Sequence, residues 1–291
     1  MSDQYIERAE YAWSDDSIRL IVTPGNTAKT TYLYVQEAGY FKTAYPYFTE
    51  RENLNSYLLI YTVSGRGQLR YGDTDYELEA GSCIYIDCRR YHHYWTEAGE
   101  TWELLWVHFN GTGAGGYYQE FAKSGFRVIY GIDHHYMKTT LWNMIELHQH
   151  KNRTTEVRCD HLLHGLAAEL IIRNGTNDSE QFFVPEYIKE IARDIEREFR
   201  QPLRLDDFAR RYHRSKYHIA KEFKKYIGVT LNEYIIVSRI SYAKEMLKYS
   251  DRPVCYIARE AGIDNVTHFI NLFKQREGVT PLVYRKEWQA G

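Results

Sequence analysis

Cysteine and long apolar runs are both scarce in this sequence. Its 291 residues contain four cysteines, which form no C-x-x-C pair and have no regular spacing. Scattered thiols of this kind are typical of reduced cysteines and argue against a disulfide framework. No run of about 18 apolar residues is present, which excludes a transmembrane helix, and the first residues lack the pattern of a signal peptide. We therefore expect a cytoplasmic protein with no membrane partner.

The whole chain has almost no net charge, but its two parts carry net charges of opposite sign. The formal net charge is −2, and 44% of the residues are hydrophobic, which excludes a fully disordered chain of this length. Residues 185–291 carry 21 basic and 15 acidic side chains, a net charge of +6, whereas residues 1–184 carry 16 and 24, a net charge of −8. The basic part favours an anionic partner, with nucleic acid the first candidate, although a solvated surface would give the same count.

Short strands are predicted between residues 32 and 109. Segments rich in β-forming residues fall at 57–63, 68–71, 76–79, 83–86 and 102–109. Glycine-containing turns are expected between them at 64–67, 72–73 and 80–81, and a polar, aromatic loop precedes the last strand. Short strands at this regular spacing predict an antiparallel barrel or sandwich.

After Gly131 the apolar period becomes that of helices. Amphipathic helices are predicted at 133–150 and 157–173, and these would close the first domain. The residues that follow are polar and turn-prone, so we place a linker at 175–184. The first domain then covers 1–174 and the second covers 185–291. The fold class expected is α+β, with a barrel followed by an all-helical domain.

A pattern of short helix, turn and longer helix occurs twice in the second domain, at 205–230 and 254–280. Both copies contain an Ala-Arg step, a Phe-Lys step and a final Gly-Val-Thr. Ser215 and Asp264 are the predicted N-caps of the longer helices. A connecting helix of about 20 residues would span about 30 Å, close to the ~34 Å between successive major-groove faces of DNA. The repeat predicts two helix-turn-helix units that enter adjacent major grooves, and a helical bundle with a chance repeat is the alternative.

The second copy carries a specific set of residues. They are Ile257, Ala258, Gly262, Phe269, Phe273 and Lys274, then Gly278-Val-Thr-Pro281 and Tyr284-Arg285. This pattern resembles the signature of the AraC/XylS family of transcription regulators, over residues 185–288. The chain departs from it at Ile263, where the family usually has an aromatic residue, and at Val266, where it has small or polar residues. The resemblance implies a transcription regulator whose partners are double-stranded DNA and RNA polymerase.

The same resemblance implies which side chains face DNA. On the first recognition helix they are Lys216, Tyr217, Ala220 and Lys221. On the second they are Asn265, Val266, Thr267, His268 and Asn271. Phosphate neutralisation is expected from Lys224, Lys225 and Lys274. By geometry, Asn271 suits paired bonds to adenine and Lys221 suits guanine or a phosphate. An exposed helix face is the alternative for each single residue.

The first domain resembles the cupin-like sensor of the same family, of the arabinose-binding type. The matching segments are Gly65-Arg-Gly67, Ala80-Gly81, Tyr91-His-His-Tyr94 and 102–109. The resemblance implies a carbohydrate effector inside the barrel, and the candidate binding residues are Arg51, His92, Tyr94 and Trp106. Aromatic rings stack on sugar C–H faces, while polar groups pair with hydroxyls. Leu104 stands where those sensors have a polar residue, and a plain barrel core would use the same aromatics.

A metal-dependent cupin enzyme is the main alternative for this domain. His92 and His93 are adjacent, so on a strand they point to opposite faces and cannot both bind one ion. With His108 as the remaining candidate, no full ligand set can be assembled. No glycine-rich phosphate loop is present, and the cysteines have no nucleophile context. We expect no metal, no other cofactor and no catalysis, and a ligand-independent DNA binder is the third reading.

Residues 157–173 carry an apolar stripe that suits pairing with a second copy of the chain. The family dimerises through this region, although a helix packed on its own barrel would show the same stripe. A ligand that prefers one arrangement of the two domains would shift the population of dimers able to bind two half-sites. The sequence therefore predicts a homodimeric regulator controlled by a small molecule.

Overall fold

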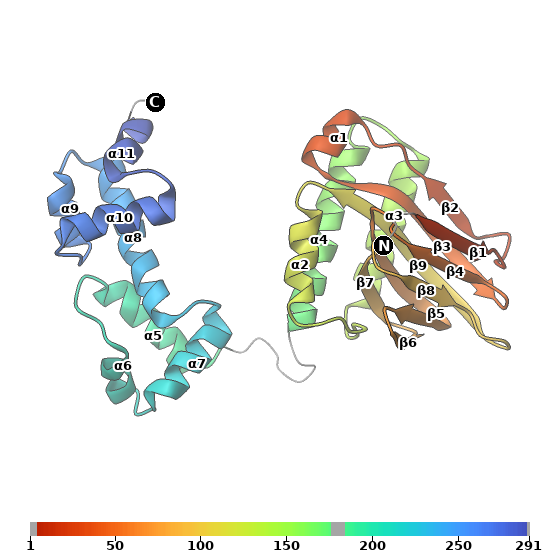
Figure 1. Ribbon diagram of the computed structural model, residues 1–291, viewed down its shortest axis with the longest axis horizontal. Helices are drawn as coiled ribbons and strands as arrows, with labels where there is room; N and C mark the ends of the chain where they lie inside the picture. The colour runs from red at the N-terminus through yellow and green to blue at the C-terminus, as the bar shows by residue number, and fades with distance from the viewer. Residues whose placement is uncertain (1–4, 176–183, 290–291) are drawn as a thin grey trace. The chain divides into compact units, whose positions relative to one another are not determined.

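A computed structural model of the chain describes residues 5–175 and 184–289, which form two compact units (Figure 1). The division between the units falls between residues 181 and 182. That point lies in the predicted linker at 175–184, but most of this segment is outside the described residues. Only Gly175 and Val184 of it are described, and each unit is considered by itself below.

The first unit is built on a curled antiparallel sheet. Its strands are β1 (Ile6–Glu10), β2 (Ile18–Ile21), β3 (Leu33–Ala44), β4 (Phe48–Glu52), β5 (Tyr57–Tyr71), β6 (Thr74–Glu79), β7 (Cys83–Asp87), β8 (His92–Trp95) and β9 (Thr101–Gly111). They are joined in the order β1-β4-β8-β5-β9-β3-β2, with β6 and β7 also paired to β5. All the described pairings are antiparallel, as the sequence predicts. Because β1 and β2 end the order, the barrel is open.

The turn predicted at 64–67 is wrong, because β5 runs through it as one strand. A bulge between Thr62 and Ser64 bends β5, whose first part pairs with β7 and β9 and whose second part pairs with β6 and β8. The glycines of this segment allow β5 and β9 to approach closely and do not reverse the direction of the chain. A Cβ at Gly65 (φ +72°) would lie 1.9 Å from the carbonyl oxygen of Thr101, and one at Gly67 would lie 2.4 Å from the indole of Trp102.

The loop predicted before the last strand is also only partly right, since β8 lies within it and pairs with both β4 and β5. Strands β1 and β2 lie before residue 32, where no strand was predicted. These three strands are four or five residues long. Segments this short carry too few alternating positions to give a period, and their pairing partners are distant in the sequence.

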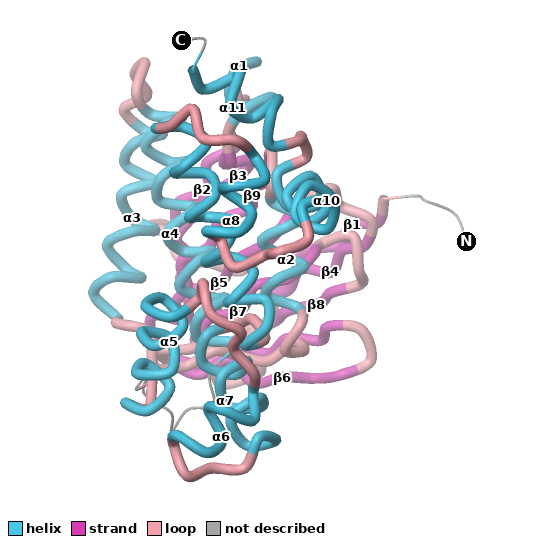
Figure 2. The backbone as a smooth tube through the Cα atoms, turned by 90° about the vertical axis from the view of Figure 1, so that its left-hand side faces the viewer, coloured by secondary structure: helices cyan, strands magenta, loops and turns pink. Residues whose placement is uncertain are grey.

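Alternation along β9 divides the first unit into two cores. Trp102, Leu104 and Trp106 face the barrel interior. The intervening side chains, Leu105, Val107 and Phe109, pack against helices. Those helices are α1 (Asn26–Thr31), α2 (Ala114–Ala122), α3 (His134–Gln149) and α4 (Thr155–Gly175), of which α3 and α4 were predicted. They cover one side of the sheet (Figure 2).

Helix α2 has no counterpart among the predicted elements. It is nine residues long and contains Gly115 and Gly116, which disfavour a helix by about 1 kcal/mol each relative to alanine. It forms because Phe121 is fully buried in the core that α3 and α4 share, with Tyr118 packed against it. Tertiary packing here outweighs a weak local propensity.

The second unit is helical throughout its described residues. The helices are α5 (Glu186–Glu198), α6 (Leu205–Arg211), α7 (Lys216–Ile227), α8 (Leu231–Tyr249), α9 (Val254–Glu260), α10 (Val266–Glu277) and α11 (Pro281–Gln289). One core gathers α5, α6, α7 and the start of α8, and another gathers the rest of α8 with α9, α10 and α11. Ile263 is buried in the second core, so it fills an apolar position although it is not aromatic.

The two recognition helices start with side-chain caps, but one of the predicted caps is wrong. Ser215 caps α7, accepting a hydrogen bond from the backbone N–H of His218. Asn265, not Asp264, caps α10. The reason is that the turn between α9 and α10 has five residues, one more than the turn between α6 and α7. None of the described helices combines the length and apolarity that crossing a bilayer requires.

Candidate DNA-binding surface and effector pocket

Helix α7 exposes one face because Ile219 and Phe223 bury the other. Its outer face is strongly basic. The exposed side chains are Lys216, Tyr217, Lys221, Lys224 and Lys225. Tyr217 is 79% exposed, and Ala220 is half-buried at the edge of this face. The Nζ atom of Lys216 lies 3.4 Å from a carboxylate oxygen of Asp206.

Helix α10 is arranged in the same way, with Phe269 and Phe273 buried. The exposed side chains of α10 and its cap include Asn265, Thr267, His268, Asn271 and Lys274. The Oδ1 atom of Asn265 accepts the backbone N–H of His268 at 2.9 Å, so this side chain is engaged in the helix cap. Val266 is half-buried against the core, which leaves only part of its surface for a thymine methyl.

Helix α8 connects these two surfaces. It has 19 residues and therefore spans about 28 Å. Leu231 and Ile235 belong to the first core of the unit, while Ile240, Ala243 and Leu247 belong to the second. Because one straight element enters both cores, it fixes the separation of the two helix-turn-helix motifs.

In the first unit a small cavity lies inside the curled sheet. Its volume is about 10 Å³, which is room for about one water molecule. The lining residues are Tyr11, Arg19, Phe41, Tyr47, Thr49, Arg51, Ile60, Tyr94, Leu104 and Trp106. Three of the four predicted effector residues, Arg51, Tyr94 and Trp106, are thus brought together. His92 is not among the lining residues.

Arg51 is the most buried charged side chain of this cavity, with 7% of the side chain exposed. Its Nε and one terminal nitrogen donate to Glu7 at 3.1 and 2.7 Å, and its other terminal nitrogen lies 2.9 Å from Nε2 of His108. Burial raises the pKa of Glu7, but hydrogen bonds from Tyr5 and Arg51 outweigh it and lower that pKa. The Glu7 carboxylate therefore stays charged on Arg51.

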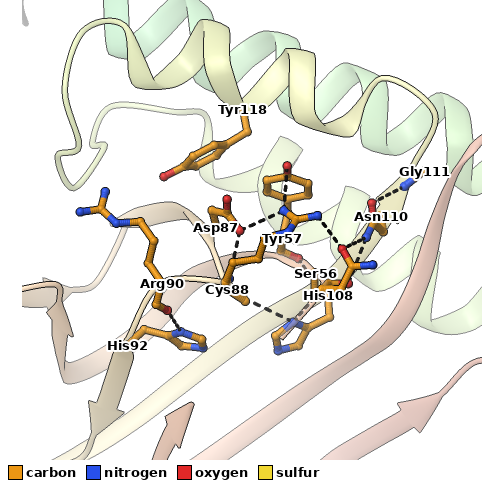
Figure 3. A network of polar contacts seen from close by, with 12 residues as sticks. Ser56, Tyr57, Asp87, Cys88, Arg90, His92, His108, Asn110, Gly111 and Tyr118 are labelled. Carbon is orange, nitrogen blue, oxygen red and sulfur yellow. Dashed lines mark hydrogen bonds and ion pairs between the residues drawn. The ribbon is translucent and has the colours of Figure 1, made fainter. Parts of the chain in front are cut away.

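The histidines nearby are neutral. Burial, with repulsion from Arg51, lowers the pKa of His108 well below its ordinary value. The Nδ1 atom of His108 lies 3.0 Å from the hydroxyl oxygen of Ser56, and both residues belong to the network of polar contacts in Figure 3. Burial lowers the pKa of His92 to about 4, and its Nδ1 bonds to the carbonyl of Arg90 at 2.9 Å. Neutral His108 can accept from Arg51 without adding a second charge.

His92 is buried while its neighbour His93 is partly exposed, which confirms that the two point to opposite faces of β8. Within residues 5–175 and 184–289, no group of three or more His, Cys, Asp and Glu side chains is placed to hold a metal ion. The two ring nitrogens of His108 are instead hydrogen-bonded, Nε2 to Arg51 and Nδ1 to Ser56.

Two family models match the chain. The AraC-like ligand binding domain matches residues 32–167, and a helix-turn-helix domain matches residues 208–287. The chain belongs to the AraC family of transcriptional regulators. It is a DNA-binding regulator with a ligand-binding domain. The two recognition helices and most of the residues that line the cavity lie within the matched residues.

Relatives of this AraC-family chain are themselves regulators. The MmsAB operon regulatory protein of Pseudomonas aeruginosa is 24% identical over 279 residues, 89% of this chain and 84% of that protein. AdaA of Bacillus subtilis, a bifunctional transcriptional activator and DNA repair enzyme, is 38% identical over 101 residues, 35% of this chain and 48% of AdaA. A structure of the DNA-binding domain of AdpA with target DNA is 20% identical, covers 35% of this chain and 93% of that one, and has a TM-score of 0.34. The chain thus spans about half the length of AdaA.

Several cavity residues of this family member escape prediction from sequence. Tyr11 and Arg19 precede the matched domain, and Tyr47 comes just before β4. Glu7 reaches Arg51 only because β1 pairs with β4 in a register that sets these two residues opposite each other. No local pattern marks such a pair, since 44 positions separate the two residues.

Proposed function

We propose that this AraC-family chain acts as a homodimer that binds double-stranded DNA through α7 and α10 and responds to a carbohydrate bound inside the barrel. The observation that carries the proposal is the pair of equal-length helices, each with a buried phenylalanine and an exposed polar face, joined by one straight helix. A connecting helix about 28 Å long suits two such faces that enter successive major grooves.

Base contacts are assigned to the middle of each helix. On α10, Asn271 offers a donor and an acceptor together, which suits adenine, and Val266 offers its exposed methyl surface to thymine. On α7, Lys221 suits a guanine or phosphate, and Tyr217 suits a thymine methyl. Phosphate contacts from the remaining lysines set the position of the chain on the duplex.

The effector is assigned to the cavity around Arg51, Tyr94 and Trp106. A sugar ring would stack on the Trp106 indole, whose Nε1 is buried without a hydrogen-bond partner among the described residues. Because the cavity holds about one water molecule, binding requires the side chains at its opening to move. Such movement ties ligand binding to a change in the protein, which is what a sensor requires.

The dimer contact is assigned to α4. Val157 and Ile172 on this helix are 44% and 43% exposed, although most of its apolar side chains pack on the sheet. A groove of about 600 Å³ lies beside it and is lined in part by Leu147, Val157 and Leu162. The proposed dimer contact would therefore use a different face of α4 from the one that packs on the sheet.

The proposal is tested in two steps. Thermal unfolding of the full chain is followed with a panel of mono- and disaccharides, and a tight ligand adds about 2.7 kcal/mol at a hundredfold excess over its Kd. The stabilisation should disappear in Trp106→Ala and persist in Trp95→Ala, because Trp95 lies on β8 outside the cavity and stacks on His93. If no sugar stabilises the protein, the carbohydrate assignment is wrong.

The second step concerns DNA. Selection from random duplexes defines a preferred site, and fluorescence anisotropy then compares it with unrelated DNA. A preference that Asn271→Ala reduces supports the assigned interface. A preference unchanged by substitutions on both recognition helices would contradict it.

A further inference from the structure

The guanidinium of Arg51 is already occupied by a carboxylate that the chain itself supplies. Glu7 accepts from both Nε and a terminal nitrogen of Arg51 through the same oxygen, at 3.1 and 2.7 Å. The Glu7 side chain is 29% exposed, whereas that of Arg51 is 7% exposed. A solvent-accessible carboxylate thus neutralises a buried cation at the edge of the cavity.

The cavity itself has a positive lining. Arg19 and Arg51 both line it, and none of its described lining residues is acidic. Arg19 is held from outside by Glu37, at 3.0 Å. The buried Nε1 of Trp106 adds a donor that has no hydrogen-bond partner in the part of the chain that the structure describes. Donors and positive charge therefore dominate the space that a ligand would enter.

The size of the cavity decides what a ligand must replace. Room for one water molecule is far below the roughly 300–1,000 Å³ of ordinary ligand sites, so a ligand of sugar size has to move side chains aside. A ligand that bonds to the guanidinium of Arg51 then has to displace Glu7, which already occupies it. Strand β1, which carries Glu7, has β4 as its partner and stands at the end of the sheet, and most of its side chains are exposed. Displacement therefore disturbs little of the core.

The charge balance then favours one class of ligand. A neutral sugar that displaced Glu7 would leave Arg51 buried without a counter-charge, which is strongly unfavourable. A ligand carboxylate restores the charge-assisted hydrogen bonds and matches the fork of the guanidinium. His108, held neutral beside Arg51, supplies no negative charge.

We propose that the effector is an acidic sugar or a similar polyhydroxy acid, whose carboxylate replaces that of Glu7 on Arg51. This inference rests on the proposed function, in which the effector binds in this cavity. It specifies the chemical class of the effector and makes Glu7 an internal competitor for the same guanidinium.

Isothermal titration calorimetry of the full chain tests the inference with two matched pairs, D-glucuronate against D-glucose and D-galacturonate against D-galactose. Each acid is expected to bind more tightly than its neutral partner. Glu7→Gln should raise the affinity for the acid about tenfold, because the competing charge is removed and more of the protein is ready to bind. Arg51→Lys should lower it about tenfold, because an ammonium cannot form the fork.

Glu50→Gln is the matched control. Glu50 lies on the same two paired strands, in the register position next to that of Glu7 and Arg51, but its ion-pair partner is Arg8, which does not line the cavity. The substitution changes the net charge by the same amount and should leave the affinity unchanged. If Glu7→Gln raises the affinity for the acid and Glu50→Gln does not, the result supports competition between Glu7 and the ligand carboxylate for Arg51.

The other outcomes separate the two proposals. Equal affinity for each acid and its neutral sugar overturns the acidic effector and leaves a carbohydrate effector in place. Weaker acid binding by Glu7→Gln overturns the competition. If acids and neutral sugars all fail to bind the natural chain and Glu7→Gln, the inference and the carbohydrate assignment both fall, while DNA binding is judged from the separate anisotropy measurement.

Discussion

The two helix-turn-helix motifs of the second unit are built alike but are chemically different. Helices α7 and α10 each have 12 residues, begin at a side-chain cap and end at a left-handed glycine, Gly228 or Gly278. Phe223 and Phe273 occupy equivalent buried positions, 50 residues apart. The shared features are those that a recognition helix needs in order to pack, which is why they recur.

The outward faces of the two helices differ in charge. Helix α7 contains four lysines and one glutamate, whereas α10 contains one lysine, one arginine and one glutamate. At equivalent positions Lys221 corresponds to Asn271, and Lys225 corresponds to Gln275. Lysines bind phosphates of any sequence, while an amide discriminates between bases. The comparison therefore suggests that α7 mainly provides affinity and α10 mainly provides specificity.

The motifs also differ in how their short helices are attached. In the first, Asp194 on α5 accepts hydrogen bonds from Arg211 at 2.6 Å and from the Tyr212 hydroxyl at 2.8 Å. In the second motif, Ala243 stands at the position equivalent to Asp194 and Ala261 at the position equivalent to Tyr212. Both alanines are fully buried. One attachment is polar and depends on charge, and the other depends on close packing of small side chains.

The turns show a third difference. His213 has a positive φ of 51°, and the equivalent residue of the second turn is Gly262, with φ of 76°. A Cβ at Gly262 would lie 2.6 Å from the carbonyl oxygen of Arg200. The first turn therefore accepts a side chain in a conformation that disfavours one, and the second has no space for it.

The largest effect is expected for Gly262→Ala. A left-handed alanine costs about 1–2 kcal/mol, and overpacking against the backbone of Arg200 adds about 1–3 kcal/mol, so the free energy of unfolding should fall by about 3 kcal/mol. Urea denaturation of the full chain followed by circular dichroism measures it. Gly278→Ala is the control, because its Cβ meets nothing within 4 Å. Equal losses in the two variants would contradict a role for close approach.

Next in size is the difference between α10 and α7 in DNA binding. Asn271→Ala should cost about 1–3 kcal/mol at the preferred site and little on unrelated DNA. Lys225→Gln, which gives α7 the residue that α10 has, should weaken binding to both DNAs alike and reduce the slope of log K against log salt by about 0.9. Anisotropy titrations over a range of salt concentrations measure both. The division of roles fails if Lys225→Gln alters sequence preference.

A smaller effect is expected from acid. Burial raises the pKa of Asp194, but hydrogen bonds from Arg211 and Tyr212 outweigh it, so the pKa is lowered in the folded chain. The resulting stabilisation is present above the unfolded value of about 3.9 and is lost as the pH falls through the lowered pKa.

Asp194→Asn should therefore reduce the free energy of unfolding by about 2 kcal/mol near neutral pH and should reduce the sensitivity to acid below about pH 4. Urea midpoints across this range measure the effect. Asp206→Asn, at an exposed ion pair with Lys216, is the control and should change little. An unchanged acid response in Asp194→Asn would contradict the role of this carboxylate.

The smallest effect is expected for His213→Gly. Relief of the left-handed conformation is worth about 1–2 kcal/mol, but the added freedom of glycine in the unfolded chain offsets about 0.5–1 kcal/mol of it. A net stabilisation of about 0.5 kcal/mol should appear as a higher midpoint in the same denaturation experiment. His213→Ala keeps the strain and serves as the control. A loss of stability in His213→Gly would show that the histidine side chain makes a compensating contact.

Prediction from sequence was most successful where structure depends on near neighbours. The helical period identified α3, α4 and the second unit, and the repeat identified both recognition helices. Ser215 was a correct cap, but Asp264 was not. The Ala-Arg steps of the two copies are 49 residues apart and the Phe-Lys steps are 50 apart, so the second turn is one residue longer and the cap moves to Asn265. In the sheet, a strand was correctly predicted at 102–109, within β9.

The effector site shows where sequence reasoning ends. Arg51, Tyr94 and Trp106 were predicted as binding residues, and they do line one cavity. His92 was grouped with them but lies outside the lining, bonded to the carbonyl of Arg90. The assignment of these residues to an effector stays a prediction that the calorimetric experiment tests.

By itself, the sequence determined the α+β class, the double helix-turn-helix and its basic surface, because caps, turns and helical periods depend on residues a few positions apart. Only the tertiary structure decided that β5 runs through its glycines, that β1 pairs with β4, and that Glu7 consequently neutralises Arg51. Strand pairing joins residues far apart in the chain, and its register follows from the packing of the whole sheet rather than from any local pattern.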